Sequence, residues 1–186
     1  IDAGTAMGSK SIFANIIKTG VDPETIGYIF LTHCHYDHTG GAAALREMTG
    51  AQTVAHELDA PYIENGDSLV TAASWYNASM EKTPVDIRVS GKQSEFSVEG
   101  RIFTFYHAPG HTPGSSVITV LSDEQLVLFG QDVHGPLHPD FKSNRKDYFE
   151  TLRFMAALNA DILCEGHYGV LKGSETVRAF IESFIR

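Results

Sequence analysis

Three histidines and one aspartate lie within one short segment of the chain, the stretch T-H-C-H-Y-D-H-T-G-G at positions 32–41. His33 and His35 are two residues apart, so their side chains point the same way if the backbone is extended. Asp37 and His38 follow as the chain turns, and they can face a second point nearby. Imidazole and carboxylate groups together suit Zn²⁺, Mn²⁺ or Fe²⁺. The segment therefore predicts a metal site.

One loop supplies only part of a coordination shell, and three further candidate ligands follow other strands. His111 lies in the Pro/Gly-rich loop of H-A-P-G-H-T-P-G-S-S, Asp132 ends L-F-G-Q-D, and His167 lies in I-L-C-E-G-H-Y-G. Each comes after a predicted strand and close to a glycine, where backbones can approach one another. We expect these side chains to join the first segment around one pocket.

The segments T-H-C-H-Y-D-H-T-G-G, P-G-H-T-P-G-S, G-Q-D and E-G-H, in this order, resemble the metallo-β-lactamase superfamily over nearly the whole chain. The resemblance implies an αββα sandwich of two mixed sheets flanked by helices, with the metals at one edge of the sheets. It implies two divalent ions, Zn²⁺ foremost, with Fe or Mn as alternatives. One ion would be held by His33, His35 and His111, the other by Asp37, His38 and His167, with Asp132 bridging them.

Two close dications lower the pKa of a shared water and polarise a carbonyl or phosphoryl oxygen. The sequence thus predicts a dinuclear hydrolase that uses a bridging hydroxide on a small ester, thioester, lactone or phosphoester, with Asp37 orienting the hydroxide. True β-lactamases tend to replace one or both of the carboxylates found here as Asp37 and Asp132. The pattern therefore looks more like the glyoxalase II-like and general metallo-hydrolase branches.

Two alternatives remain open on the same scaffold. A mononuclear iron enzyme like the sulfur dioxygenases would use fewer of the same ligands. A metal-stabilised binding module without activity would need no open coordination position. A serine hydrolase is not expected, because G-S-S at 114–116 lacks the nucleophile-elbow pattern.

Four other histidines flank the candidate ligands. His134 and His138 lie in the Gly/Pro-rich loop after Asp132. We expect His134 to border the pocket, where it would contact substrate or donate a proton, and His138 to do so less readily. His107 is expected to pack or to orient the His111 loop. His56 is expected at the surface or as a cap.

The long segment between the first and second ligand motifs contains Trp75, Tyr76 and Met80. Their helical spacing predicts core packing, with a lid or an apolar pocket wall as the alternative. Within the first motif, Cys34 and Tyr36 are expected to pack behind the ligands rather than to bind metal.

The elements that carry these residues mix strands with helices. Helices are predicted over 9–19, 41–49, 146–160 and 174–185, and strands over 26–32, 52–55, 85–90, 94–98, 101–107, 115–121, 125–130 and 161–165, with irregular helical structure over 56–82. No repeat or linker interrupts them. One α/β domain over residues 1–186 is therefore the economical prediction.

Composition limits the partners. The 186 residues have a formal charge of −9 at pH 7, which argues against nucleic acid or an anionic membrane and leaves a small-molecule substrate. No apolar run is long enough to span a bilayer, and two cysteines make no disulfide framework, so a cytoplasmic protein is expected. The opening I-D-A-G suggests that N-terminal strands are missing, which would expose a sheet edge to pairing or homo-oligomer formation.

Overall fold

The computed structural model describes residues 1–185, which divide into two compact units, one of residues 1–89 and one from residue 90 onward. Each unit has its own sheet, its own helices and its own hydrophobic core. The α/β fold class, with two sheets flanked by helices, is confirmed. That residues 1–186 act as a single domain stays a prediction.

The N-terminal unit is built on a three-stranded sheet of order β1-β2-β3, with all strands parallel. Parallel neighbours need a crossover connection, and here helices supply both crossovers. A mixed sheet was expected here, so that detail was wrong. The elements are α1 (Ser9–Lys18), β1 (Tyr28–Phe30), α2 (Tyr36–Thr39), α3 (Ala42–Thr49), β2 (Gln52–His56), α4 (Ala60–Asn65) and β3 (Ile87–Val89), with the 3₁₀ helices η1 (Ala6–Gly8), η2 (Pro23–Thr25) and η3 (Ala73–Tyr76).

Helix α3 ends where the sequence predicts, because Gly50 adopts the left-handed conformation that stops a helix (φ 75°). Its inner face packs with β1 and β2 in a core that includes Ile29, Leu31 and Leu45. The candidate ligand loop follows the carboxyl end of the buried strand β1.

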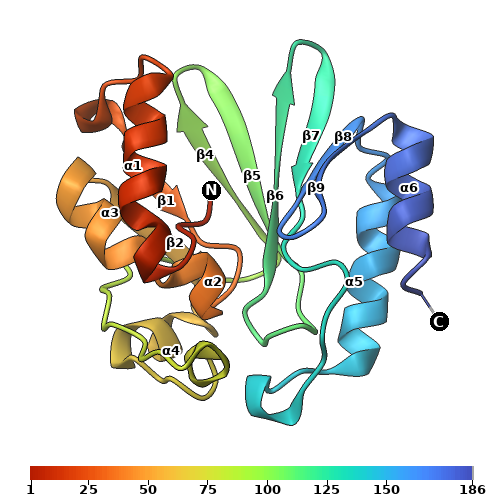
Figure 1. The fold of residues 1–186 in the computed structure, drawn as a ribbon. Coiled ribbons are helices and arrows are strands. Elements are labelled where there is room, and N and C mark those ends of the chain that lie inside the picture. Colours follow the sequence, from red (N-terminus) through yellow and green to blue (C-terminus); the bar gives the residue numbers. More distant parts are fainter. Residues whose placement is uncertain (186) are drawn as a thin grey trace. The chain divides into compact units, whose positions relative to one another are not determined.

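The C-terminal unit is built on a six-stranded sheet of order β4-β5-β6-β7-β8-β9. All neighbours are antiparallel except β7 and β8, whose parallel pairing is connected through α5. Figure 1 shows α5 and α6 side by side, and both contribute to the core of this unit. The elements are β4 (Gln93–Val98), β5 (Arg101–His107), β6 (Ser116–Ser122), β7 (Gln125–Phe129), η4 (Pro139–Phe141), α5 (Arg145–Ala157), β8 (Ile162–Glu165), β9 (Gly169–Lys172) and α6 (Ser174–Glu182).

Strand β9 was not predicted, because three of its four residues are exposed and no alternation marks it. Its antiparallel pairing with β8 makes the His167 loop a tight hairpin turn between two strands. Among the described residues, no helix is both long enough and apolar enough to cross a bilayer.

Candidate metal centre

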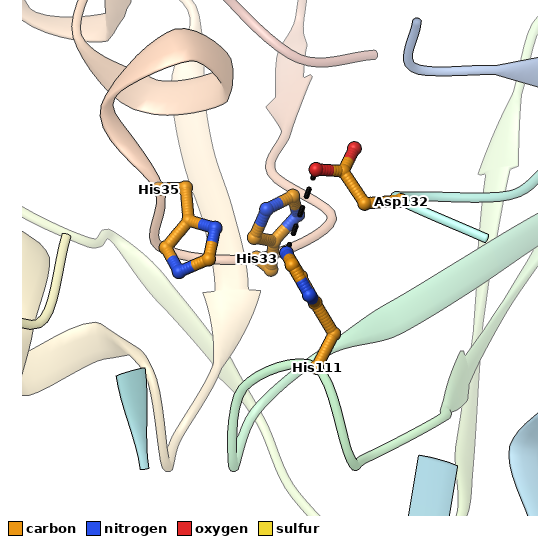
Figure 2. Close-up of side chains that lie close together, drawn as sticks. All are labelled: His33, His35, His111 and Asp132. Carbon is orange, nitrogen blue, oxygen red and sulfur yellow. Dashed lines mark ion pairs between the residues drawn. The ribbon is translucent and has the colours of Figure 1, made fainter. Parts of the chain in front are cut away.

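The loop that leaves β1 gathers three imidazoles within the N-terminal unit. The ring centroids of His33 and His35 are 4.6 Å apart, and those of His33 and His38 are 4.2 Å apart. All three side chains are buried. The backbone bends at residues 32–34 and then makes the single helical turn α2, which carries Asp37 and His38. His33 and His35 from this loop are drawn in Figure 2. The predicted ligands of the first motif thus lie together.

Asp2 is a functional candidate that the sequence did not reveal. Its Oδ1 accepts a hydrogen bond from the Thr32 backbone N–H (2.8 Å), and its Oδ2 accepts one from the Thr32 hydroxyl (2.9 Å). Nδ1 of His38 lies 2.8 Å from the same Oδ2. With Nδ1 held as a donor to the carboxylate, Nε2 is the nitrogen of His38 that can ligate a metal. The only signal in the sequence was an aspartate in the opening I-D-A-G.

A second buried carboxylate supports this loop through its backbone. Asp59 is fully buried and accepts a hydrogen bond from the Cys34 N–H (2.9 Å). Burial, reinforced by the nearby Asp59 carboxylate, raises the pKa of the Cys34 thiol well above its usual value. Cys34 is fully buried, which agrees with its expected packing role.

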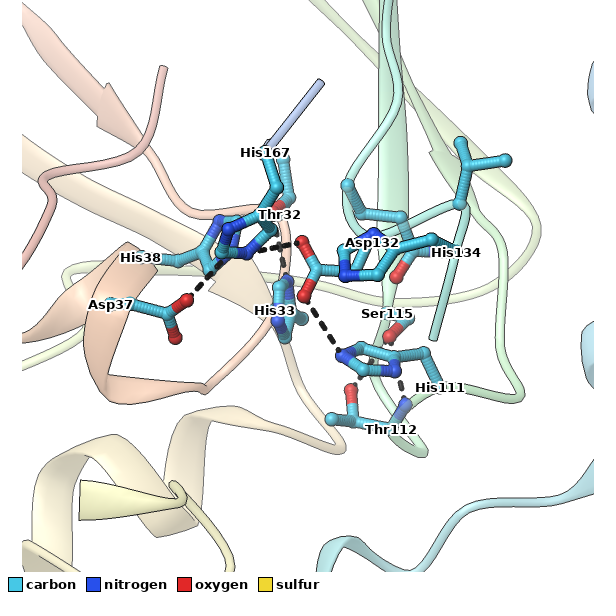
Figure 3. A network of polar contacts seen from close by, with 12 residues as sticks. Thr32, His33, Asp37, His38, His111, Thr112, Ser115, Asp132, His134 and His167 are labelled. Carbon is cyan, nitrogen blue, oxygen red and sulfur yellow. Dashed lines mark hydrogen bonds and ion pairs between the residues drawn. The ribbon is translucent and has the colours of Figure 1, made fainter. Parts of the chain in front are cut away.

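In the C-terminal unit, Asp132 lies between two histidines that come from different strand exits. Oδ2 of Asp132 is 3.5 Å from Nε2 of His111, and Oδ1 is 3.4 Å from Nε2 of His167. His111 and Asp132 are buried, whereas the His167 side chain is 41% exposed. Figure 3 shows one carboxylate oxygen turned toward each imidazole, and Figure 2 shows the pair of His111 and Asp132. A carboxylate placed in this way can serve two ions.

The His111 loop is held by hydrogen bonds from three sides. Nε2 of His107 donates to the Pro113 carbonyl (2.9 Å), so His107 orients this loop as expected. The Thr151 hydroxyl donates to the Pro109 carbonyl (2.8 Å). Ser115 is buried, and its hydroxyl accepts from the Thr112 N–H (2.9 Å; Figure 3). Ser115 therefore closes the turn that follows His111.

His134 is oriented by Glu165, a buried carboxylate that the sequence analysis did not single out. Nδ1 of His134 lies 3.0 Å from Oε1 of Glu165, and its ring contacts the rings of His167 (5.0 Å) and Tyr168 (5.4 Å) edge-on. Burial alone would raise the pKa of Glu165. Hydrogen bonds from His134 and from the N–H groups of His167 and Tyr168 outweigh burial and lower it, so this carboxyl is ionised.

Some predictions for other residues near the candidate ligands are confirmed, and others are wrong. Met80 is buried, as predicted, but Trp75 and Tyr76 are 53% and 47% exposed, so core packing was wrong for them. His56 is buried at the end of β2, where its Nδ1 accepts from the Leu58 N–H, so a surface position was wrong. Nδ1 of His138 accepts from the Asp140 N–H and caps η4.

Two sheets flanked by helices, with histidine and aspartate side chains on the loops that leave the strands, define an α/β metalloprotein. The chain belongs to the metallo-β-lactamase superfamily, whose family model matches residues 1–167. This match runs through all seven candidate ligands, the residues His33, His35, Asp37, His38, His111, Asp132 and His167.

Named relatives agree with this family. A hydroxyacylglutathione hydrolase of Pseudomonas aeruginosa is 31% identical over 146 residues, which are 75% of this chain and 47% of the relative. A probable metallo-hydrolase of Methanocaldococcus jannaschii is 28% identical over 127 residues, 68% of this chain and 58% of the relative. The chain thus matches between about half and three fifths of the length of these relatives.

Solved structures share the fold over almost the whole chain. A B3 metallo-β-lactamase with an active-site glutamic acid has a TM-score of 0.81 and 27% identity, covering 97% of this chain and 74% of its own. The subclass B3 metallo-β-lactamase BJP-1 of Bradyrhizobium japonicum has a TM-score of 0.80 and 22% identity, covering 98% of this chain and 78% of its own. At 22% identity the likeness to BJP-1 concerns the fold alone.

Proposed function

We propose that this protein is a dinuclear metal-dependent hydrolase of a small ester, thioester, lactone or phosphoester. The observation that carries the proposal is the position of Asp132, with one carboxylate oxygen next to His111 and the other next to His167. The superfamily match and the two named relatives, both hydrolases, support a hydrolytic reaction.

The donor set fits two divalent ions. Five imidazoles and two carboxylates are the ligands that Zn²⁺ favours, and they also suit Fe²⁺ and Mn²⁺. In the proposed arrangement His33, His35 and His111 would hold one ion, Asp37, His38 and His167 would hold the other, and Asp132 would contribute to both sites. The hydrogen bond from Nδ1 of His38 to Asp2 supports this assignment, because it leaves Nε2 for the metal.

When bound, two such ions would lower the pKa of a water molecule and polarise the carbonyl or phosphoryl oxygen of the substrate. Within the chain, we assign to Asp37 the orientation of the attacking water. Oδ2 of Asp37 is 3.7 Å from Nε2 of His38, on the same helical turn. His134 is assigned to substrate contact. Its Nδ1 is engaged with Glu165, so Nε2 is the atom that would meet a substrate oxygen.

The substrate class follows from charge and from the ligand carboxylates. A formal charge of −9 disfavours nucleic acid. The presence of both Asp37 and Asp132 favours general hydrolysis over antibiotic breakdown, although the fold is shared with β-lactamases. One named relative is a hydrolase of hydroxyacylglutathione, which is a thioester, so thioesters are the first substrates to test.

The test combines metal analysis with a substrate screen. The chain is stripped with a chelator, reloaded with Zn²⁺, Mn²⁺ or Fe²⁺, analysed for bound metal, and assayed on thioesters, lactones and phosphodiesters. We expect about two equivalents and activity that is lost on chelation. Asp132→Asn should abolish activity, whereas Asp123→Asn, which removes the same charge at the β6–β7 turn, should leave it unchanged.

The outcomes separate the competing functions. One bound metal with full activity refutes the dinuclear mechanism. Oxygen consumption with a persulfide substrate and bound iron indicates a mononuclear dioxygenase. Two tightly bound metals without turnover on any substrate, and without an exchangeable water, favour a binding module.

A further inference from the structure

We infer that Glu165 is a positioning residue that ties the Asp132 loop to the His167 loop and thereby sets the geometry of the second metal site. The inference rests on the proposed function. It concerns a residue two positions before His167, at the end of β8, whose side chain is fully buried.

Each carboxylate oxygen of Glu165 accepts two hydrogen bonds. Oε1 accepts from the Val133 N–H (2.9 Å) and from Nδ1 of His134 (3.0 Å). Oε2 accepts from the N–H groups of His167 (2.7 Å) and Tyr168 (2.8 Å). One oxygen therefore holds the chain directly after Asp132, while the other holds the backbone of His167 itself.

The role of the Glu165 side chain follows from the point at which the backbone hydrogen bonds between the parallel strands β7 and β8 end. Beyond the paired residues of β7 and β8, the Gly130 N–H donates to the Cys164 carbonyl (3.0 Å) and the Gly166 N–H donates to the Gln131 carbonyl (3.3 Å). Farther along, backbone N–H groups of both segments donate hydrogen bonds to the Glu165 carboxylate instead. Its side chain thus continues the tie between the two strands after their backbones separate.

Glu165 is assigned to support rather than to metal binding, although it lies with Asp132 and His134 in a group of potential donors. All four hydrogen bonds point at its two oxygens, and removing any of them would leave a buried charge less well compensated. His134 presents Nδ1 to the same carboxylate, so this nitrogen is also engaged. The arrangement is typical of a support for ligands.

Glutamine cannot replace Glu165 without a conflict. A Gln side chain has nearly the same volume, but it offers one carbonyl oxygen and one NH₂ group. Whichever way the amide is turned, its NH₂ faces at least one backbone N–H donor. The expected result is a shift of the Asp132 loop, the His167 loop or both, with the fold retained.

The experiment titrates Co²⁺ into the metal-free full chain and follows the visible absorption of the bound ion, with equilibrium dialysis to obtain the affinity of each equivalent. In Glu165→Gln we expect one equivalent to bind about 10–100-fold more weakly, as for other partners of metal ligands, while the other stays closer to wild type. Glu182→Gln is the matched control, because it removes the same charge from an exposed ion pair on α6. It should bind both equivalents normally.

Two results overturn the inference. Unchanged affinities in folded Glu165→Gln would show that the loops do not depend on this carboxylate. An equal loss for both equivalents that follows the fall in thermal stability would show a role in folding alone. If Glu165→Gln does not fold, Glu165→Asp is titrated, since its shorter carboxylate can reach only one of the two loops and should give the same unequal loss. Wild-type protein that binds a single equivalent refutes the proposed function, and the comparison of variant and wild type at that equivalent still tests Glu165.

Discussion

Gly110 is the position where a single methyl group should damage the site most directly. It precedes His111 and has a φ of 130°, a conformation that side chains rarely adopt. A Cβ placed on it would lie 2.1 Å from the backbone nitrogen of Tyr148 and 2.3 Å from its Cα. These atoms belong to the first turns of α5, so they cannot move without displacing the helix.

The expected cost has two parts. Holding a residue other than glycine in a disfavoured backbone region costs about 1–3 kcal/mol, and forcing a group into a packed region costs about 1–3 kcal/mol more. Gly110→Ala should therefore lower the free energy of unfolding by about 2–6 kcal/mol. Against a typical total of about 5–15 kcal/mol, this loss is a large share of the stability of the fold.

The assay is urea unfolding of the metal-free protein, so that bound metal does not contribute to the measured stability. Gly91→Ala is the matched control, since Gly91 also has a positive φ (75°) in the same unit, but apart from Gly91 and its two chain neighbours nothing lies within 4 Å of the point where its Cβ would stand. The control should lose about 1–2 kcal/mol, from backbone conformation alone. If the two variants are equally stable, the close approach of the His111 loop to α5 is not as described.

Three further predictions concern other parts of the chain. Burial would raise the pKa of Asp86, but hydrogen bonds from Thr53 and from the Arg46 guanidinium outweigh it and lower the pKa. The ionised Asp86 carboxylate should stabilise the fold fully above its unfolded-state pKa of about 4. This contribution should be lost as the pH falls through the lower pKa of the folded state. Acid unfolding of Asp86→Asn should therefore show a shallower pH dependence than that of the wild type. Cys34 should resist thiol reagents in the folded protein and react after denaturation, as measured by labelling and mass spectrometry, and rapid native labelling would contradict its burial. Trp75, the single tryptophan, should show emission that iodide quenches readily in the native state, and a shielded, blue-shifted emission would contradict its exposure.

Much of the fold was predictable because local patterns mark its elements. The helix stop at Gly50 and the strands that precede His111, Asp132 and His167 all follow from residue types over short windows. The exposure of Trp75 was not predictable in this way. Helical spacing suggested burial, but the segment folds into the short 3₁₀ helix η3, and a single turn of helix cannot bury every apolar side chain that it carries.

The candidate ligands were visible in the sequence, whereas the groups that orient them were not, and the reason is distance along the chain. Asp2 contacts Thr32 and His38, which are 30 and 36 residues away. Glu165 reaches Val133, 32 residues away. A metal motif is recognisable because its ligands are dense and chemically unusual, but a supporting carboxylate looks like any other acid until the fold brings its donors to it.

Both carboxylates, Asp2 and Glu165, are linked to a histidine through Nδ1, and both also hold the backbone of a strand-exit loop. Each therefore fixes the direction of an imidazole and the path of its loop together, which is why removing either should alter metal affinity before it alters the fold.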